Sequence, residues 1–283
     1  MKSKYLVVIG DSRDMREVAS DSVQLVVTSP PYFNVKDYGR ENIGSINEFY
    51  DYLMEMQLVF NECYRVLEKG RYCCINVGDV ISEGEKYPIP AHFVIMLKRA
   101  GFDYREDIIW RKPSGVGARG GSGAGKRFGV FMQHPYPMYY FPNNIFEHIL
   151  VFRKGKFDYK KASEEQKRRA KVDVEEAKRR WNSDVWEFHP ETRNQYSELT
   201  HPAMFPEELP EGLIRLYAFK GETVLDPFLG SGTTLEVARN LERSCIGYEI
   251  NPAYLPLIRR KAGFDESGEL EIVNRGGDGN DRG

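Results

Sequence analysis

The sequence predicts an α/β fold built on a doubly wound, mostly parallel sheet with an inserted region. Three observations support this prediction. Short apolar, β-branched runs alternate along the chain with segments whose apolar residues recur at helical spacing. Several runs end in glycine or proline turns, the place where ligands bind in open α/β sheets. With 283 residues and 41% hydrophobic content, the chain can bury one sizeable core and still carry an insertion.

The first half of the chain supplies strands and helices in alternation. A helix is expected over residues 49–67, where apolar residues recur every three or four positions, with Gly70 as its stop. A second helix is expected over residues 91–100, ended by Gly101. Strands are predicted over residues 5–9, 23–28, 72–77, 107–110 and 145–152.

The second half repeats this alternation after two irregular stretches. Residues 113–144 are rich in Gly, Pro and aromatic side chains, and residues 153–181 are highly charged with a helical pattern. The charged helix is expected to begin at Ser163, with Gln166 completing a capping box. Further helices are predicted over residues 213–219 and 233–241, and further strands over residues 223–225 and 244–248.

The near-neutral total charge hides a strongly basic middle. The whole chain has a formal net charge of −2. Residues 111–181 hold 17 Lys and Arg against 7 Asp and Glu, a local net of +10, so the rest of the chain carries −12. Such a concentration favours a surface that follows nucleic-acid phosphates, although a solvated helix face would have the same composition.

The four cysteines lack the paired spacing of a zinc site or of a secreted disulfide framework. Because Cys63, Cys73, Cys74 and Cys245 lie within helix or strand patterns, we expect them to pack in the core and to bind no metal. The first residues lack the features of a signal peptide, and no apolar run approaches the ~18 residues of a membrane span. The sequence therefore predicts a soluble, cytoplasmic protein with reduced thiols.

A glycine-rich turn follows one predicted strand and opens a helix. Glycines let a ligand approach the backbone, and a helix N-terminus favours an anionic group. Glu249 ends the next strand, where a carboxylate can accept hydrogen bonds from two ribose hydroxyls. The turn has no Lys for a triphosphate, and Asp226 would repel phosphate but suit an ammonium. The turn consists of Asp226, Pro227, Phe228, Leu229, Gly230, Ser231, Gly232, Thr233 and Thr234.

A ligand that has a ribose, a carboxylate and an amine fits this unit, and S-adenosylmethionine has all three. The turn resembles the cofactor-binding motif Asp-Pro-Phe-x-Gly-Ser-Gly-Thr-Thr of the amino-methyltransferases. The resemblance implies that the turn binds S-adenosylmethionine, with Glu249 on the ribose and Asp226 on the amino end.

A second loop, Thr28-Ser29-Pro30-Pro31-Tyr32, also follows a predicted strand. The amino group of a base is a weak nucleophile because its lone pair is delocalised into the ring. The Ser29 hydroxyl and the Pro30 carbonyl can each accept a hydrogen bond from that amine and direct its lone pair towards a methyl donor. The prolines fix φ, and Tyr32 offers a flat face for stacking a flipped base. We therefore predict that Ser29, Pro30, Pro31 and Tyr32 form the catalytic loop, with Thr28 at the cofactor.

The first residue of this loop bears on the target base. The loop resembles that of the DNA amino-methyltransferases, which usually begins with Ser in cytosine-N4 enzymes and with Asp in adenine-N6 enzymes. RNA-modifying relatives mostly carry Asn or Asp there. Ser29 therefore favours cytosine N4, with adenine N6 and an RNA base amine as alternatives. Methylation at cytosine C5 needs a Cys nucleophile, normally after Pro, and no cysteine here follows a proline.

Two shorter segments also resemble family motifs. His201 and Phe205 belong to a His-Pro-Ala-Met-Phe-Pro segment that resembles the one closing over the methionine part of the cofactor. Asp11 belongs to a Gly-Asp-Ser segment that resembles the one whose Asp contacts the cofactor adenine. The resemblance implies cofactor contacts from all three residues. Trp110 and Trp186 lie in further family-like segments, where core packing is the expected role.

The order of the motifs resembles the circularly permuted β-class arrangement, because the catalytic loop precedes the cofactor turn. The resemblance is to cytosine-N4-specific DNA methyltransferases with a Rossmann-like class I fold. It implies a catalytic half over residues 1–112, an inserted target-recognition region over 113–194 and a cofactor-binding half over 195–275. Residues 145–152 are expected to form a strand of the main sheet, and residues 276–283 a disordered tail.

The basic region is the expected contact to double-stranded DNA. Residues 120–127 look like a phosphate loop but end in Arg where Ser or Thr would bind magnesium, so a mobile loop touching DNA fits better. The predicted contacts are Arg119, Lys126, Arg127, Arg168 and Arg169. Nearby aromatic residues either pack a small core of their own or meet bases: Phe128, Phe131, Tyr136, Tyr139 and Tyr140. The resemblance also implies a restriction-modification system with a cognate endonuclease, and we expect a monomer or homodimer.

Overall fold

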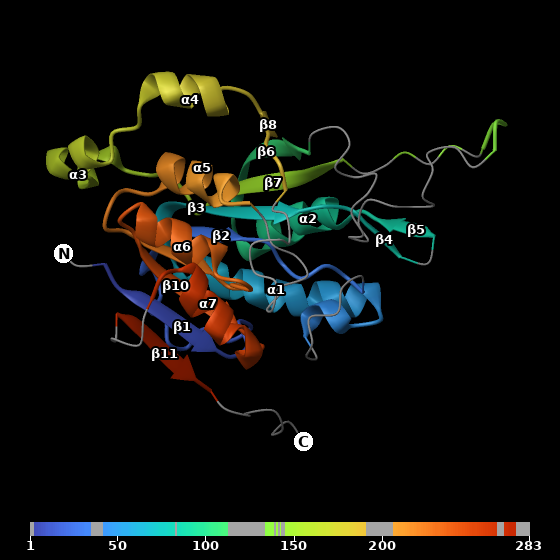
Figure 1. The fold of residues 1–283 in the computed structure, drawn as a ribbon, viewed down its shortest axis with the longest axis horizontal. Helices are drawn as coiled ribbons and strands as arrows, with labels where there is room; N and C mark the ends of the chain where they lie inside the picture. Colours follow the sequence, from blue (N-terminus) through green and yellow to red (C-terminus); the bar gives the residue numbers. More distant parts are fainter. Residues whose placement is uncertain are drawn as a thin grey trace.

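A twisted nine-stranded sheet forms the centre of the molecule (Figure 1). The strand order is β11-β1-β10-β9-β2-β3-β7-β6-β8, and a separate hairpin is formed by β4 and β5. The computed structural model describes residues 3–34, 42–82, 84–112, 134–138, 140, 142, 145–190, 206–264 and 269–275.

Only β7 runs antiparallel to its neighbours in this sheet. The carboxyl ends of the other eight strands and the amino end of β7 therefore lie at one edge, which we call the carboxyl edge. The strands are β1 (Tyr5–Ile9), β2 (Val23–Thr28), β3 (Leu67–Val77), β4 (Val80–Ser82), β5 (Glu85–Tyr87), β6 (Asp103–Arg111), β7 (Phe146–Arg153), β8 (Val185–Glu187), β9 (Thr223–Asp226), β10 (Ser244–Glu249) and β11 (Leu270–Asn274).

Helices cover both faces of the sheet, so the fold has three layers (Figure 1). On one face, α1 (Phe49–Val66) and α2 (Ile89–Ala100) pack against the strands. On the other face lie α5 (Glu208–Tyr217), α6 (Thr233–Asn240) and α7 (Leu255–Lys261). The remaining short helices are η1 (Ile43–Ser45), η2 (Tyr159–Lys161), α3 (Glu164–Arg169), α4 (Val174–Trp181) and η4 (Pro252–Tyr254).

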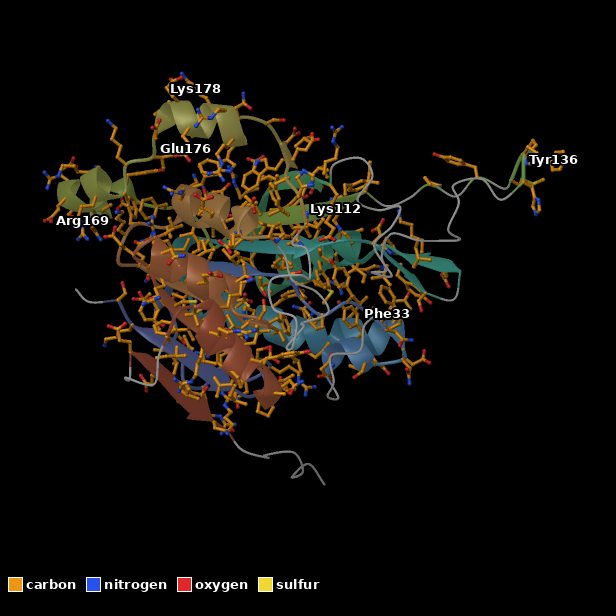
Figure 2. All side chains as sticks on the ribbon, in the orientation of Figure 1. Phe33, Lys112, Tyr136, Arg169, Glu176 and Lys178 are labelled. Atoms are coloured by element: carbon orange, nitrogen blue, oxygen red, sulfur yellow. The ribbon has the colours of Figure 1, made fainter. Side chains whose placement is uncertain are left out.

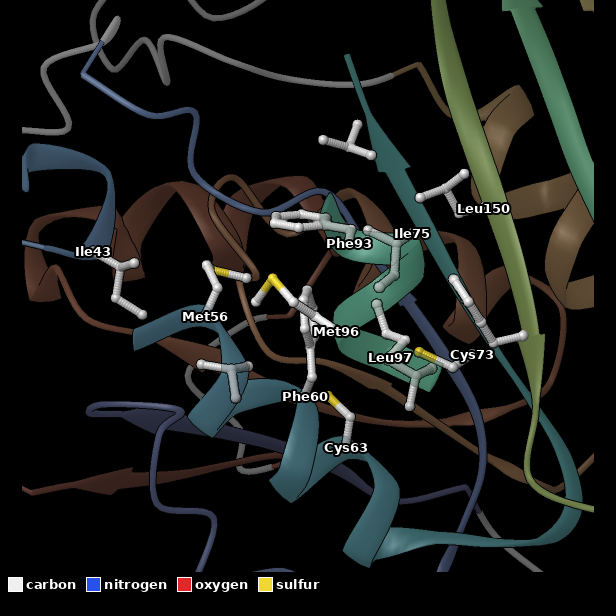
Figure 3. Close-up of a cluster of buried hydrophobic side chains, with 14 of the residues drawn as sticks. Ile43, Met56, Phe60, Cys63, Cys73, Ile75, Phe93, Met96, Leu97 and Leu150 are labelled. Carbon is white, nitrogen blue, oxygen red and sulfur yellow. The ribbon is translucent and has the colours of Figure 1, made fainter. Parts of the chain in front are cut away.

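The apolar stripes of α1 and α2 meet over the sheet in a dense cluster (Figure 3). Met56 and Phe60 come from α1, Phe93 and Leu97 from α2, and Ile75 from β3, and each is at most 1% exposed. Burying a side chain of this size stabilises the fold by roughly 1.5–3 kcal/mol. The apolar residues that recur at helical spacing in the sequence are thus the ones that pack α1 and α2 against the sheet.

The doubly wound α/β prediction is confirmed, and the predicted strands all appear within a few residues of their expected ends. The stretch predicted at residues 145–152 is β7, in the main sheet. Gly101 ends α2 in the left-handed conformation, with φ at 109°, as expected of a helix stop. The proposed disordered tail, residues 276–283, lies outside the described residues.

Gly70 has a different role from the predicted helix stop. Helix α1 already ends at Val66, and β3 begins at the next residue and runs through Gly70. The Gly70 N–H donates to the Lys154 carbonyl at 2.5 Å, and a Cβ at position 70 would lie 2.6 Å from Phe157 Cα. The glycine is therefore required by the close approach of a second backbone, because any side chain would collide with it.

The charged segment forms two short helices where one was predicted. The capping box at Ser163 and Gln166 is present and opens α3. Helix α3 stops at Arg169, and Asp173 caps a new helix, α4, by accepting hydrogen bonds from the N–H groups of Glu175 and Glu176. An Asp side chain competes for backbone donors in this way, which favours a helix start over a helix interior.

The packing predictions for cysteine and tryptophan are confirmed. All four cysteines are free thiols in the core, at most 1% exposed. Trp110 and Trp186 are 3% and 2% exposed. Within the part of the chain that the structure describes, no helix combines the length and apolar character of a membrane span. The same residues hold no group of three or more His, Cys, Asp or Glu side chains arranged for a metal ion.

Candidate active site

A cleft opens at the carboxyl edge of the sheet, between the loops that follow four strands. It encloses about 810 Å³ of space, part of it open to solvent. Strand β9 pairs with both β2 and β10, so the loops after these three strands are neighbours. The lining includes Gly10, Asp11 and Ser12 after β1, Ser29, Pro30 and Pro31 after β2, Pro227, Phe228, Leu229, Gly230, Ser231 and Thr233 after β9, and Glu249 and Ile250 at the end of β10.

The glycine-rich turn forms one wall of the cleft. Gly232 is the N-cap of α6 and has φ at 90°, a conformation that side-chain-bearing residues rarely adopt. Helix α6 starts at Thr233, so its first unpaired N–H groups and the positive end of its dipole lie at the cleft. The turn and the start of α6 can therefore hold an anionic group, such as the carboxylate of an amino acid.

Glu249 lies opposite the turn and is 8% exposed. Its Oε2 accepts a hydrogen bond from the Gly230 N–H at 2.8 Å, and its Oε1 accepts one from the Asn251 N–H at 2.8 Å. A carboxylate has about four acceptor positions, so it can still accept a hydroxyl group of a ligand. Burial raises the pKa of Glu249 to about 7, although hydrogen bonds from the backbone of Asn251, Gly230 and Ile250 oppose the shift.

Asp226 is placed differently from the expected ammonium contact. It is 0% exposed and is not part of the cleft lining. Its carboxylate accepts hydrogen bonds from the hydroxyls of Thr28 at 2.7 Å and Thr234 at 2.6 Å, and from the Phe228 N–H at 3.0 Å. Burial raises the pKa of Asp226 to about 6 against these three hydrogen bonds. Asp226 therefore ties the end of β2 to the glycine-rich turn.

The Ser-Pro-Pro-Tyr loop forms the wall of the cleft beside that turn. Ser29 and Pro30 line the cleft, and no hydrogen bond within the described residues engages the Ser29 hydroxyl or the Pro30 carbonyl. The Pro31 carbonyl accepts a hydrogen bond from the Tyr52 hydroxyl of α1 at 3.0 Å, which anchors the loop. Tyr32 is 7% exposed, and its hydroxyl donates to the buried Glu147 carboxylate.

Family and structure comparisons bear directly on this site. A family model described as DNA methylase matches residues 23–260, which is most of the chain and includes both loops. The chain belongs to the DNA methylase family. This DNA methylase uses S-adenosylmethionine as its cofactor, and the cleft between the two loops has groups suited to each end of that molecule.

Among curated proteins, this DNA methylase is similar to the type II methyltransferase M.MjaI of Methanocaldococcus jannaschii. The two are 34% identical over 97% of this chain and 98% of the relative. Similarity to the type II methyltransferase M.MthZI of Methanothermobacter thermautotrophicus is 31%, over 97% of this chain and 81% of the relative.

Solved structures agree with the fold. The protein TTHA0409 of Thermus thermophilus, in complex with S-adenosyl-L-methionine, aligns with a TM-score of 0.74 and 30% identity over 96% of this chain and 98% of that one. The cytosine-N4-specific PvuII DNA methyltransferase aligns with a TM-score of 0.69 and 21% identity, over 94% of this chain and 89% of that one. The second likeness shows a shared class I fold.

The other predicted cofactor contacts of this DNA methylase are only partly described. Asp11 lines the cleft, and its carboxylate accepts hydrogen bonds from the backbone N–H of Arg13 at 2.9 Å and from Arg13 Nε at 2.8 Å. Arg13 also pairs with Glu55 of α1, so Asp11 is held in place at the cleft. His201 and Phe205 lie outside the described residues.

Two of the five predicted DNA contacts of this DNA methylase lie in the described residues, and both belong to α3. Arg169, in α3, is 3.8 Å from Glu242, in the turn that leads into the amino end of β10. Helix α3 therefore lies at the edge opposite the cleft. Figure 2 shows Arg169 far from Phe33, the residue that follows the Ser-Pro-Pro-Tyr loop. Arg168 is also in α3. Arg119, Lys126 and Arg127 lie outside the described residues.

Two aromatic residues of the basic region bear on the alternative between a small core and contacts with bases. Tyr136 and Tyr140 are 65% and 62% exposed, so these two do not pack a core of their own. Figure 2 shows Tyr136 extending away from the body of the DNA methylase, at the same end of the molecule as Phe33. Phe128, Phe131 and Tyr139 lie outside the described residues.

Proposed function

We propose that this protein methylates the exocyclic N4 amino group of cytosine in a specific double-stranded DNA sequence. The observation that carries the proposal is the pair of acceptors on the catalytic loop. The Ser29 hydroxyl and the Pro30 carbonyl lie at the cofactor cleft, without hydrogen bonds in the described part of the chain. An amine placed between them has two donors to offer, so both acceptors can orient it.

The chain's own residues act by positioning and by electrostatics. When bound, S-adenosylmethionine supplies an electrophilic methyl group on a sulfonium. Glu249 would hold the ribose, and the start of α6 at Thr233 would hold the carboxylate of the amino-acid end. Ser29 and Pro30 would accept hydrogen bonds from the target amine, which turns its lone pair towards the cofactor. Water takes the released proton, because the amine loses it only as or after it attacks.

Base flipping is part of the proposal, because the target amine of a paired base is not accessible inside the duplex. Tyr32 is proposed to stack on the flipped base. In the structure Tyr32 is 7% exposed, so stacking requires the groups that cover the ring to move aside and expose one of its faces, while the ring keeps its position. Base–aromatic stacking is worth about 1–3 kcal/mol, which can offset a small rearrangement.

Adenine N6 is the second candidate target. The same fold and the same acceptor geometry suit either exocyclic amine, since both are conjugated to a ring. Ser29 at the start of the loop favours cytosine, on the pattern seen in the family's Ser-type and Asp-type loops. An RNA base amine is a weaker candidate, because RNA-modifying relatives mostly begin this loop with Asn or Asp.

The partners follow from the same proposal. Double-stranded DNA is the proposed substrate, bound through Arg119, Lys126 and Arg127 of the basic region. M.MjaI and M.MthZI are named type II methyltransferases, which supports a role in restriction-modification beside a cognate endonuclease. We propose a cytoplasmic protein that works as a monomer or homodimer.

The deciding experiment identifies the methylated base. Plasmid DNA is incubated with the protein and methyl-labelled S-adenosylmethionine, digested to nucleosides and analysed by mass spectrometry. We expect N4-methylcytosine, and sequencing of the same DNA would map the target site. N6-methyladenine would transfer the proposal to the second candidate, and no label in DNA but label in RNA would overturn the DNA substrate.

A further inference from the structure

A buried carboxylate lies next to the catalytic loop, outside the cofactor cleft. Glu147, near the start of β7, is 7% exposed. It accepts hydrogen bonds from the side-chain amide of Asn76 at 2.7 Å, from Lys112 Nζ at 2.5 Å, and from the Tyr32 hydroxyl. Because β7 is antiparallel, its start lies where β3 and β6 end, and this brings residues from distant parts of the chain to one point.

The carboxylate at this point is charged. Burial alone would raise the pKa of Glu147, but the Lys112 ammonium and the hydrogen bonds from Asn76 and Tyr32 outweigh it and hold the pKa below its ordinary value. Hydrogen bonds to an ionised acceptor are stronger than those between neutral groups. The Tyr32 hydroxyl is therefore held by a charge-assisted hydrogen bond at neutral pH.

Two features describe this network. The first shows that the Glu147 side chain is held in one position, and the second shows that the arrangement lowers the stability of the fold. A Cβ added at Gly78 would lie 3.1 Å from Glu147 Cγ, so the neighbouring backbone confines the Glu147 side chain. The side-chain amide N–H of Asn76 donates a hydrogen bond to Glu147, while the Asn76 Oδ1 is buried without a hydrogen-bond partner in the described part of the chain. Leaving an acceptor unsatisfied has a cost that a core built only for stability avoids.

We propose that Glu147 is a positioning residue for the methyl-transfer reaction, which acts by fixing the ring of Tyr32. The inference rests on the proposed function, in which Tyr32 stacks on the target base. Glu147 does not contact the base, and its effect passes through the Tyr32 hydroxyl. A ring that is already oriented loses less freedom when the base stacks on it, so the reactive geometry forms more often.

Two conservative variants and their combination test the inference. Tyr32→Phe removes only the hydroxyl, and Glu147→Gln removes the charge while keeping the shape. Loss of one hydrogen bond to a charged group should slow single-turnover methyl transfer to the mapped duplex roughly 10-fold in each variant. The double variant should be no slower than the slower of the two single variants, because both changes act on the hydrogen bond between Tyr32 and Glu147. Calorimetry with S-adenosylhomocysteine should show unchanged affinity.

A spectroscopic signal separates positioning from a merely structural role. With 2-aminopurine in place of the target base, flipping raises the fluorescence, and both variants should lower that rise. Glu187→Gln is the matched control, because Glu187 pairs with Arg111 at 2.8 Å in a half-exposed ion pair on the neighbouring strands. It should keep the wild-type rate and signal.

The outcomes distinguish this inference from the proposed function. Additive losses in the double variant, or a Tyr32→Phe enzyme with wild-type rate and fluorescence, would overturn the role of Glu147. Because Tyr32→Phe leaves the Glu147 ion pair intact, it gives this answer even if Glu147→Gln does not fold. A Tyr32→Leu variant removes the ring itself. If it is as active as wild type, base stacking on Tyr32 is wrong, and the inference falls with it.

Discussion

Two adjacent residues differ in their surroundings where β2 ends: one side chain is buried in the fold, and the other faces the cleft. Thr28 is 2% exposed and bonded to Asp226, whereas Ser29 faces the cleft with an unengaged hydroxyl within the described residues. A hydroxyl placed in this way is available to a substrate at no cost to the fold. Ser29 is thus the residue at which catalysis can be tested with little effect on stability.

Replacing Ser29 with Ala should leave cofactor affinity nearly unchanged and slow methyl transfer. Loss of one preorganised polar partner typically lowers the rate about 10²–10³-fold. Single-turnover assays would measure the rate, with Ser22→Ala, at the opposite end of β2, as the control. Ser29→Asp should keep some activity and broaden acceptance towards adenine. Wild-type turnover in Ser29→Ala, or a covalent adduct between enzyme and DNA, would refute this role.

Glu249 is the residue through which the cofactor site can be weakened. We propose that Glu249 accepts hydrogen bonds from the ribose, so Glu249→Ala should remove that acceptor at a cost of about 1–3 kcal/mol. The dissociation constant for S-adenosylmethionine should then rise roughly 5- to 150-fold. Isothermal titration calorimetry would measure it, with Glu271→Ala, an exposed carboxylate on β11, as the control. An unchanged constant would remove Glu249 from the site.

The two buried carboxyl groups predict how stability depends on pH. Burial raises the pKa of Asp226 to about 6 and that of Glu249 to about 7, from ordinary values of 3.8 and 4.5. The folded state therefore binds these protons more tightly than the unfolded state, and the stabilisation is lost as pH rises from about 4 to about 7. Glu249→Gln should show a smaller fall in the free energy of unfolding between pH 5 and pH 7.5, measured in urea without cofactor. Equal falls would contradict the assignment.

At the scale of elements, β2 and the glycine-rich turn are joined by one carboxylate. Asp226 takes hydroxyl hydrogen bonds from Thr28 on β2 and Thr234 on α6. Thr28→Val keeps the shape but removes one of these bonds from a fully buried acceptor. The free energy of unfolding should fall by about 1–3 kcal/mol.

Urea unfolding would measure this difference. Thr223→Val, three residues before Asp226 on β9, is the matched control, because its hydroxyl has no hydrogen bond among the described residues. The control should stay within about 0.5 kcal/mol of wild type. Equal losses in both variants would mean that the effect comes from the valine and is independent of the link to Asp226.

Most of the elements could be predicted from the sequence because their patterns are local. The strands β1, β2, β9 and β10, and the helices α1 and α2, show periodic apolar residues that depend only on the element itself. The break between α3 and α4 escapes prediction because charged residues satisfy a helix pattern on either side of Asp173. The role of Gly70 could not be predicted either, because the backbone that requires a glycine there comes from residues 154–157, far along the chain.

The site was predictable where its residues form contiguous motifs. Ser29 and Gly230 come together at one cleft because β2 and β9 are neighbours, as the two motifs indicated. Glu147 could not be found in the same way. Its sequence neighbours indicate only a strand, and its partners Tyr32 and Asn76 lie more than seventy residues away along the chain. The motifs indicate which residues are candidates for the reaction. The side chains that hold these candidates in place, such as Glu147, depend on which strands become neighbours.

On the scale of the whole molecule, the cleft and helix α3 occupy opposite edges of the sheet. A duplex that enters the cleft at Ser29 would have to extend around the body of the protein to reach Arg168 and Arg169. Residues 119–127 begin eight positions after β6 in the sequence, and β6 ends at the carboxyl edge. We therefore propose this basic segment, ahead of α3, as the DNA contact.

The salt dependence of DNA binding tests whether residues 119–127 or helix α3 contacts the DNA. Replacing Lys126 and Arg127 together by Ala should lower the slope of log affinity against log salt by about 1–2 units, since each phosphate contact contributes nearly one. Replacing Arg168 and Arg169 together by Ala should leave the slope unchanged, because α3 lies at the far edge. Fluorescence anisotropy with a duplex at several salt concentrations would measure both. The opposite result would place the DNA on the α3 side.

The buried cysteines have a practical consequence for following DNA engagement. All four thiols lie in the core, at most 1% exposed, and burial raises the pKa of each of them. Maleimide reagents attack exposed thiolates, so the native protein should resist labelling. A single cysteine introduced at Tyr136, which is 65% exposed, would then be the one reactive thiol. The wild-type chain, whose own thiols are buried, can thus serve as the background into which one reactive cysteine is introduced for distance measurements by fluorescence or spin labels.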